Sequence, residues 1–123
     1  MEKATLIDEH TKRNYDLIAL VKEHGRELTI GRSADNIIVL GMDEAGNIRP
    51  REDVLKHWKQ ISRNHATISY DLVRNIFYIE DSSTNGTYLG KEKRRLDKGQ
   101  KAILIHSHHL FFGQDYHLIF TQE

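Results

Sequence analysis

Two alternating stretches joined by a short polar turn place the strongest constraint on how this chain folds. Residues 66–70 and 76–81 are rich in Ile, Tyr and Phe and alternate in polarity, which predicts two β-strands. The polar residues 71–75 between them are typical of a hairpin turn. Because a hairpin returns the chain to the end where it started, the polar loops before residue 66 and after residue 81 should be neighbours in space.

The rest of the chain repeats this short-strand pattern. About ten short strands, with turn signals roughly every 8–12 residues, predict an all-β sandwich. Tyr, Leu, Ile and Val in residues 15–22 favour a buried strand there. The other strands are expected at residues 4–7, 28–30, 37–40, 87–89, 101–105, 109–112 and 117–121.

Residues 41–60 interrupt the strand pattern. A loop-like start is followed by Pro50, which suits a first helical turn, and apolar residues then recur at helical spacing. We expect a short amphipathic helix just before Ser62. Within it we interpret Trp58 as a residue that packs on the sheet edge; the alternative is that the insertion shapes a binding site.

Length and composition limit the class of protein. The 123 residues predict one domain, 1–123, with a core at about 15–121 and an insertion at about 41–60. The absence of cysteine excludes disulfides and thiolate metal sites. Eighteen basic and eighteen acidic residues leave no net charge to attract nucleic acid or membranes. With neither a long apolar run nor a signal-peptide core, the protein is expected to be intracellular and cytoplasmic.

The sequence argues against three other kinds of site: a hydrolase site, a nucleic-acid site and a metal site. A hydrolase would need Ser62, His65 and Asp81 as a triad, but Ser62 lacks the Gly-x-Ser-x-Gly elbow. The basic run at 91–95 contains Glu92 and no aromatic residue, so we interpret it as a solvated hairpin tip rather than a nucleic-acid site.

A histidine cluster raises the question of a metal. On a strand, His106 and His108 would share one face while His109 points to the other, and no cysteine or carboxylate completes the set. We therefore expect no metal, no cofactor and no catalytic residue.

The polar loops instead favour an anion site. Gly31 and Arg32 follow a predicted strand, and a guanidinium fork matches phosphate oxygens. Asn85 and Gly86 form a strong turn signal by themselves, but the preceding Ser-Ser-Thr adds hydroxyl groups that suit an anion and a peptide backbone.

With these motifs in order, the chain resembles a forkhead-associated (FHA) domain, a phosphothreonine-binding β-sandwich. The resemblance runs from about residue 28 to 120 and rests on Gly31-Arg32, then Ser62-x-x-His65, then Asn85-Gly86. It implies an eleven-stranded sandwich, and the long spacing between the arginine and serine motifs marks residues 42–59 as inserted.

The resemblance also implies roles for individual residues. Those expected to contact phosphate are Arg32, Ser62, Arg63 and Thr84. Asn85 would hold the ligand backbone just after the phosphothreonine. Architectural roles would fall to Gly31, His65 and Gly86.

The implied activity is binding rather than catalysis. We expect a monomeric phosphothreonine-dependent module of Ser/Thr kinase signalling, whose partner is a threonine-phosphorylated protein or peptide and not nucleic acid or membrane. The alternative is a sandwich that binds protein without phosphate through the insertion around Trp58.

Overall fold

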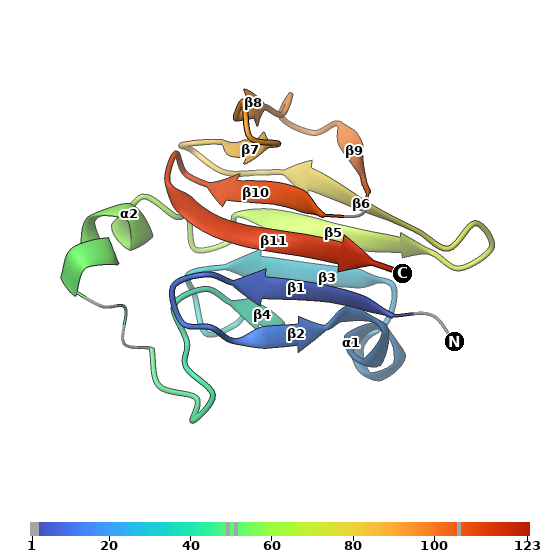
Figure 1. The fold of residues 1–123 in the computed structure, drawn as a ribbon, viewed down its shortest axis with the longest axis horizontal. Helices are drawn as coiled ribbons and strands as arrows, with labels where there is room; N and C mark the ends of the chain where they lie inside the picture. Colours follow the sequence, from blue (N-terminus) through green and yellow to red (C-terminus); the bar gives the residue numbers. More distant parts are fainter. Residues whose placement is uncertain (1–2, 49, 51, 106) are drawn as a thin grey trace.

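Two β-sheets pack face to face in the computed structural model, which describes residues 3–48, 50, 52–105 and 107–123 (Figure 1). One sheet has the strand order β2-β1-β11-β10-β7-β8, and the other has the order β4-β3-β5-β6-β9. The described residues thus form eleven strands, which confirms the expected sandwich. The strands are β1 (Ala4–Asp8), β2 (Asn14–Asp16), β3 (Glu27–Gly31), β4 (Ile38–Val39), β5 (Ala66–Asp71), β6 (Ile76–Asp81), β7 (Thr87–Leu89), β8 (Arg94–Arg95), β9 (Lys101–Leu104), β10 (His108–Phe112) and β11 (Tyr116–Gln122).

The alternating pattern of the central strands builds the core between the sheets. Every second residue is buried in β5, in β6 and in β11 as far as Phe120, so one face of each strand points inward. Phe77 of β6 meets Phe120 of β11 edge to face, with ring centroids 5.7 Å apart. The two sheets are therefore held together by apolar contacts. The loops at their ends are not needed for the core and can carry polar groups.

Strand β1 lies inside its sheet, between β2 and β11. Its last inward residue is Asp8, which is fully buried and accepts a hydrogen bond from the Tyr116 hydroxyl at 2.7 Å. The other carboxylate oxygen accepts the backbone N–H groups of His10 and Thr11. Burial and the neighbouring Asp8 raise the pKa of Tyr116. Asp8 thus closes the β1–β2 turn with each carboxylate oxygen hydrogen-bonded.

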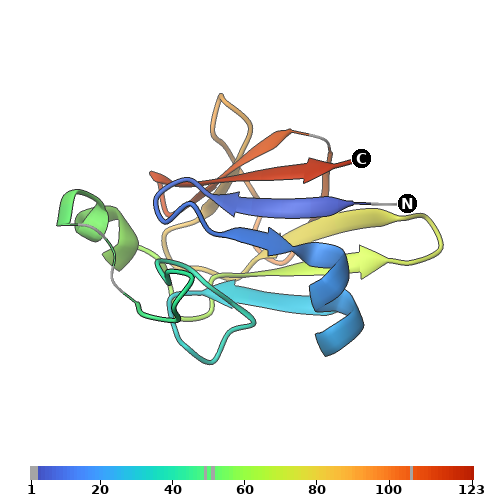
Figure 2. The ribbon, with the colours of Figure 1, turned by 60° about the horizontal axis from the view of Figure 1, so that its bottom comes forward.

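The expected strand at residues 15–22 is wrong. The chain leaves β2 at Asp16 and forms helix α1 (Leu17–His24), which lies beside the sheets (Figure 2). The Asp16 side chain accepts the Ala19 N–H, and Gly25 ends the helix with a φ of 101°. The apolar composition reflects packing of one helix face on the core rather than a strand.

The insertion contains the expected short helix. A 3₁₀ turn, η1 (Glu52–Val54), leads into α2 (Leu55–Lys59), which protrudes from one end of the sandwich (Figure 1). Arg49 and Arg51 lie outside the described residues.

The charged turn after β7 also differs from expectation, because Arg94 and Arg95 form strand β8 and pair with β7. Among the described residues, no helix is long and apolar enough to span a membrane.

Replacing Asp16 by Ala should remove the N-cap of α1 and lower the free energy of unfolding by about 1 kcal/mol. Asp16→Asn keeps an oxygen acceptor and should retain most of that stability. Urea unfolding followed by circular dichroism compares the two variants. An equal loss in both would show that the capping bond is not what stabilises this end of the helix.

Candidate functional site

Three loops meet at the end of the sandwich where α2 protrudes (Figure 1). They are residues 32–37 after β3, residues 60–65 between α2 and β5, and residues 82–86 between β6 and β7. The first loop is tied to the second by backbone bonds from Arg32 N–H to Ser62 O and from Ser33 N–H to Arg63 O. The hairpin argument from sequence is confirmed, because the second and third loops are also in direct contact.

His65 makes the contact between the second and third loops. Its ring is fully buried, and Nδ1 accepts the backbone N–H of Ser62 at 3.0 Å. Nε2 lies 2.8 Å from the carbonyl oxygen of Gly86. A carbonyl only accepts and an N–H only donates, so the imidazole is neutral with its proton on Nε2.

Burial lowers the pKa of His65, although the bond to Gly86 and the nearby Asp81 act in the opposite direction. Since backbone groups occupy both ring nitrogens, the geometry is not that of a base beside the Ser62 hydroxyl. Asp81 bonds elsewhere, so the three residues do not form the arrangement of a catalytic triad.

Asp81 shapes the third loop from inside. The carboxylate oxygen Oδ1 accepts bonds from the Ser83 N–H, the Ser83 hydroxyl and the Thr87 hydroxyl. The Ser83 hydroxyl oxygen in turn accepts the Gly86 N–H at 2.7 Å. Gly86 has a φ of 95°, a conformation that favours glycine. With Asp81 and Ser83 buried, Thr84 and Asn85 stay exposed.

Ser62 and Thr84 are joined directly. The Thr84 N–H donates to the Ser62 hydroxyl oxygen at 3.1 Å, so the Ser62 hydroxyl hydrogen stays free to donate. Asn85 is anchored as well, because its amide nitrogen donates to the Gln60 carbonyl at 2.8 Å. Asn85 is exposed, and its side-chain oxygen is a candidate acceptor.

Arg32 lies between the second loop and the insertion. Its Nε donates to the Ile61 carbonyl at 2.9 Å, and its guanidinium carbon is 5.2 Å from the centre of the Trp58 ring. Among the described residues, neither terminal nitrogen of Arg32 has a hydrogen-bond partner. One edge of the guanidinium is therefore fixed, and the other edge is open to an anion.

The interpretation of Trp58 as a packing residue is confirmed. Its indole N–H donates to the Leu40 carbonyl at 2.8 Å, and its ring fills the space above Gly41. A Cβ atom at Gly41 would lie 2.4 Å from the indole nitrogen, so only glycine fits there. The indole also lies against Arg32, so the insertion contacts a candidate site residue as well as the sheet edge.

Gly31 and Arg63 meet through the backbone. A Cβ atom at Gly31 would lie 2.1 Å from the Arg63 carbonyl oxygen, which also accepts the Asn36 amide at 2.6 Å. The Arg63 side chain is exposed, so in this structure its fixed contacts are those of its main chain. Asn36 is buried and was missed by sequence reasoning, which treated residues 33–36 only as a loop.

A hollow of about 260 Å³ lies beside Thr84 and Asn85. Arg95 reaches it from β8, with its guanidinium carbon 5.9 Å from the centre of the Tyr88 ring. Arg95 is exposed, as expected of a solvated tip, but its guanidinium also lies against Tyr88 and Gly86. The hollow is lined by Gln60, Thr84, Asn85, Tyr88, Arg95 and Gln114.

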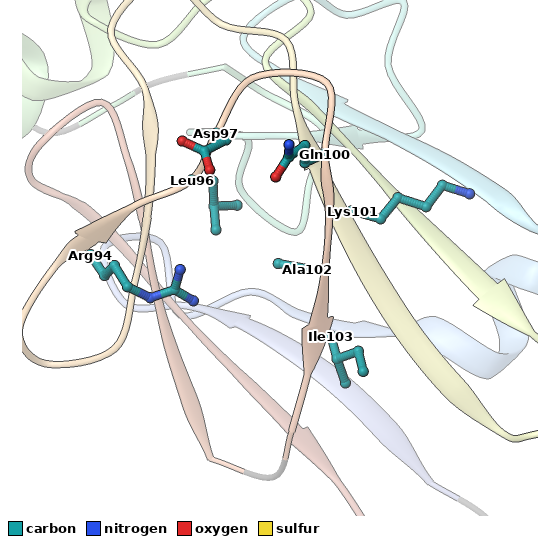
Figure 3. A pocket seen from close by; sticks show the side chains of 7 residues that line it. All are labelled: Arg94, Leu96, Asp97, Gln100, Lys101, Ala102 and Ile103. Carbon is teal, nitrogen blue, oxygen red and sulfur yellow. The ribbon is translucent and has the colours of Figure 1, made fainter.

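A larger groove, of about 450 Å³, opens between β8 and β9 (Figure 3). Arg94 borders this groove, whereas its neighbour Arg95 borders the hollow. Strand β8 thus separates two concave surfaces.

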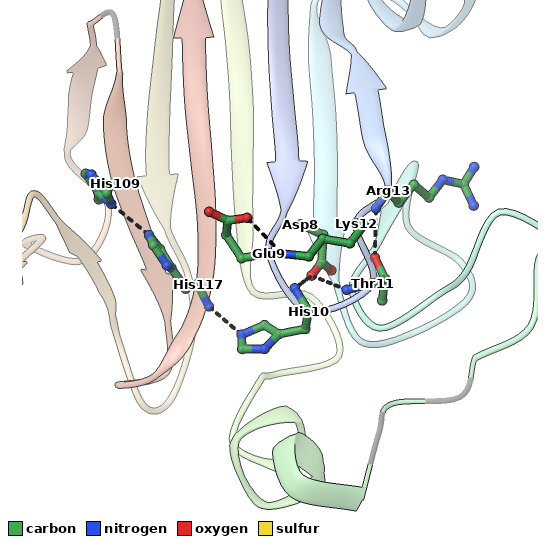
Figure 4. Close-up of polar contacts among 8 residues, drawn as sticks. All are labelled: Asp8, Glu9, His10, Thr11, Lys12, Arg13, His109 and His117. Carbon is green, nitrogen blue, oxygen red and sulfur yellow. Dashed lines mark hydrogen bonds and ion pairs between the residues drawn. The ribbon is translucent and has the colours of Figure 1, made fainter.

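Two histidines that are not part of the three loops lie close to each other on neighbouring strands. His109 Nδ1 and His117 Nε2 lie 2.8 Å apart on β10 and β11 (Figure 4). His108 is on the same strand as His109, and His106 lies outside the described residues. No group of three or more His, Asp, Glu or Cys residues in the described ranges could hold a metal ion.

Comparison with known protein families identifies this arrangement. The sequence profile of the FHA domain matches residues 28–113, which covers all three loops. The chain belongs to the FHA family. No curated protein sequence gives a significant match.

Solved FHA domains share the fold along nearly the whole chain. The N-terminal FHA domain of S. cerevisiae Rad53p, solved with a phosphothreonine peptide, is 19% identical with a TM-score of 0.69, covering 98% of this chain and 94% of that chain. The MEK1 FHA domain, solved with a HOP1 phosphothreonine peptide, is 20% identical with a TM-score of 0.66, covering 96% and 94%. A third, from a study of phosphothreonine-dependent FHA interactions, is 21% identical with a TM-score of 0.67, covering 98% and 97%.

Acidification should destabilise the fold through His65. Because its folded-state pKa lies below the ordinary value of 6.5, the unfolded chain binds a proton first as the pH falls. The contribution of the neutral ring is complete above about pH 6.5 and is lost as the pH falls toward the folded pKa. Burial lowers the pKa of His108 and His117 too, which adds in the same direction.

Two measurements test this expectation. Urea unfolding should give a smaller free energy of unfolding near pH 5.5 than near pH 7.5. An NMR titration should place the midpoint of the His65 imidazole below 6.5. A midpoint above that value would contradict the neutral bridge.

Proposed function

We propose that this FHA domain is a phosphothreonine-dependent protein-binding module in Ser/Thr kinase signalling. The observation that carries the proposal is the linkage of Arg32, Ser62 and Thr84 through main-chain and hydroxyl contacts at one end of the sandwich. Arg32 would bind phosphate oxygens with its terminal nitrogens and Ser62 with its hydroxyl hydrogen. Thr84 would add a second hydroxyl, and Arg63 would swing in from the exposed side.

The energies suit a reversible interaction. Phosphothreonine carries about −1.5 to −2 charges and three acceptor oxygens. Each charge-assisted hydrogen bond contributes about 1.5–3 kcal/mol, so a few of them account for micromolar binding near −8 kcal/mol. A pocket for the threonine methyl would add about 1–3 kcal/mol of preference over phosphoserine.

Asn85 would set the register of the ligand. Its side-chain oxygen would accept a backbone N–H of the residue after the phosphothreonine, while its amide stays on the Gln60 carbonyl. The adjoining hollow would then receive a side chain that follows the phosphothreonine. With Arg95 and Gln114 at its border, this hollow would favour a carboxylate or amide side chain.

The solved relatives support this proposal, since two of them are complexes with phosphothreonine peptides. Binding of this kind requires no bond to be broken, so we propose no enzymatic activity. Because protein kinases make phosphothreonine ligands, we propose that the domain acts inside the cell. Residues 1–123 would act as one monomeric module, with residues 41–60 contributing to the site through Trp58 and Gln60.

Arg32→Ala should weaken binding to phosphothreonine peptides about 10- to 100-fold, since it removes charge-assisted bonds. Fluorescence polarisation against a degenerate phosphothreonine pool measures the loss, with phosphoserine and unphosphorylated pools for comparison. Arg74→Ala is the matched control, because Arg74 is an exposed arginine in the β5–β6 turn. Unchanged affinity of Arg32→Ala would overturn the site assignment.

Trp58 substitutions test the support of the guanidinium. Trp58→Phe keeps an aromatic ring under Arg32 and should bind within about twofold of the native protein, whereas Trp58→Leu should bind about fivefold more weakly. Calorimetry with one phosphothreonine peptide measures both variants. If partner binding were instead lost in every Trp58 variant yet kept in Arg32→Ala, the phosphate-independent alternative would be correct.

A further inference from the structure

One edge of the sandwich concentrates positive charge in a chain that has none overall. Residues 91–101 contain six basic and two acidic side chains, a net charge of +4, and these charged side chains are exposed. The basic residues are Lys91, Lys93, Arg94, Arg95, Lys98 and Lys101. A local field of this kind attracts acidic segments without attracting anions to the whole molecule.

The groove between β8 and β9 lies within this basic edge (Figure 3). Arg94 and Ala102 face the space between the two strands, and Leu96 descends into it, while Lys101 and Ile103 point to the other side of β9. Leu96 is nearly buried and gives the groove an apolar floor. The surface therefore offers a guanidinium beside a small aliphatic patch.

Both strands that border the groove have open edges. Among the described residues, β8 pairs only with β7, and β9 pairs only with β6. Each strand thus presents backbone groups on its free edge, which can pair with an added extended chain. Ile103 beside the groove is 51% exposed and Ile105 is 61% exposed, so an added chain would also cover apolar surface.

Strand β8 connects this groove to the loop site. Neighbouring side chains on a strand point to opposite faces, which directs Arg95 to the hollow beside Asn85 and Arg94 to the groove. The groove therefore lies on the other side of β8 from the hollow, and one ligand could contact both surfaces.

We propose that the β8–β9 groove binds an acidic, extended segment of the same partner, outside the phosphothreonine motif. Carboxylates of that segment would pair with Arg94 and with the exposed lysines other than Lys93, which is paired with Asp115, and an aliphatic side chain would rest on Leu96 and Ala102. This inference rests on the proposed function. A peptide is favoured over nucleic acid because none of the described residues that line the groove has an aromatic side chain on which a base could stack.

The test compares matched phosphothreonine peptides. One is short, one carries an acidic extension with one Leu, and one carries a Gln/Ser extension of equal length with the same Leu. A flexible Gly/Ser linker of about 4 to 12 residues joins the extension to either side of the phosphothreonine motif, so that linkers of several lengths can be tested for one that spans the distance to the groove. On the native protein the acidic extension should bind about fivefold more tightly than the neutral one, as a few exposed ion pairs allow.

Charge reversal then locates the contact. Arg94→Glu should abolish the advantage of the acidic extension while leaving the short peptide unchanged. Arg74→Glu makes the same charge change at the β5–β6 turn, at the other end of the sandwich, and should keep the advantage (Figure 1). NMR should show amide shifts in Lys101–Leu104 with the acidic extension only.

The outcomes separate the two proposals. If the short phosphothreonine peptide does not bind the native protein, the proposed function fails. If it binds but the acidic extension adds nothing, or if Arg74→Glu removes the advantage as fully as Arg94→Glu does, only the groove proposal is overturned. A single-stranded oligonucleotide that binds the native protein and not Arg94→Glu, with no gain from the acidic peptide, would also overturn it.

Discussion

The loop end of this domain, where we propose that the ligand binds, depends on one buried, neutral imidazole. His65 accepts a hydrogen bond from the Ser62 N–H and donates one to the Gly86 carbonyl, so it joins loops that lie next to different strands. Phe112 packs on the ring at a centroid distance of 5.3 Å and limits its rotation. An apolar side chain of similar size would leave the Ser62 N–H without its partner, at a cost of about 1–3 kcal/mol, and would leave the Gly86 carbonyl with only its bond from the Gly113 N–H. The distance between the Ser62 and Gly86 loops is thus set by the width of a histidine ring.

The insertion completes this end of the domain. Its indole supports Arg32 from below, and its last residue, Gln60, accepts the Asn85 amide and packs against Gly113 in the β10–β11 turn. Lys93 and His57 both approach Asp115 in that turn, at 3.0 and 3.4 Å. Because α2 contacts both the first loop and this turn, residues 52–60 behave as part of the site wall. A family pattern built from short loops alone would not describe this wall.

Sequence reasoning succeeded where one physical signal dominated. The alternation of residues 76–81 gave the bounds of β6 without error, because side chains of a half-buried strand must alternate. Sequence reasoning failed at residues 17–24, because an apolar composition suits a strand and a packed helix equally. The side-chain cap from Asp16 is what favours the helix there. The three motifs located Arg32, Ser62 and Asn85. Asn36, Arg95 and the bond between Gln60 and Asn85 were missed because the partners come from distant segments, which no local pattern reveals.

The two ends of the described chain lie together, at the end of the sandwich away from the three loops (Figure 1). Ala4 pairs with Gln122 in the antiparallel β1–β11 ladder, which fixes this proximity. A bead, a fluorescent label or a neighbouring domain attached to either end would project from the same end of the sandwich, away from the three loops where we propose that the ligand binds. Pulling on both ends at once would load β1 against β11 directly, so mechanical tension would peel this pair of strands before it reached His65.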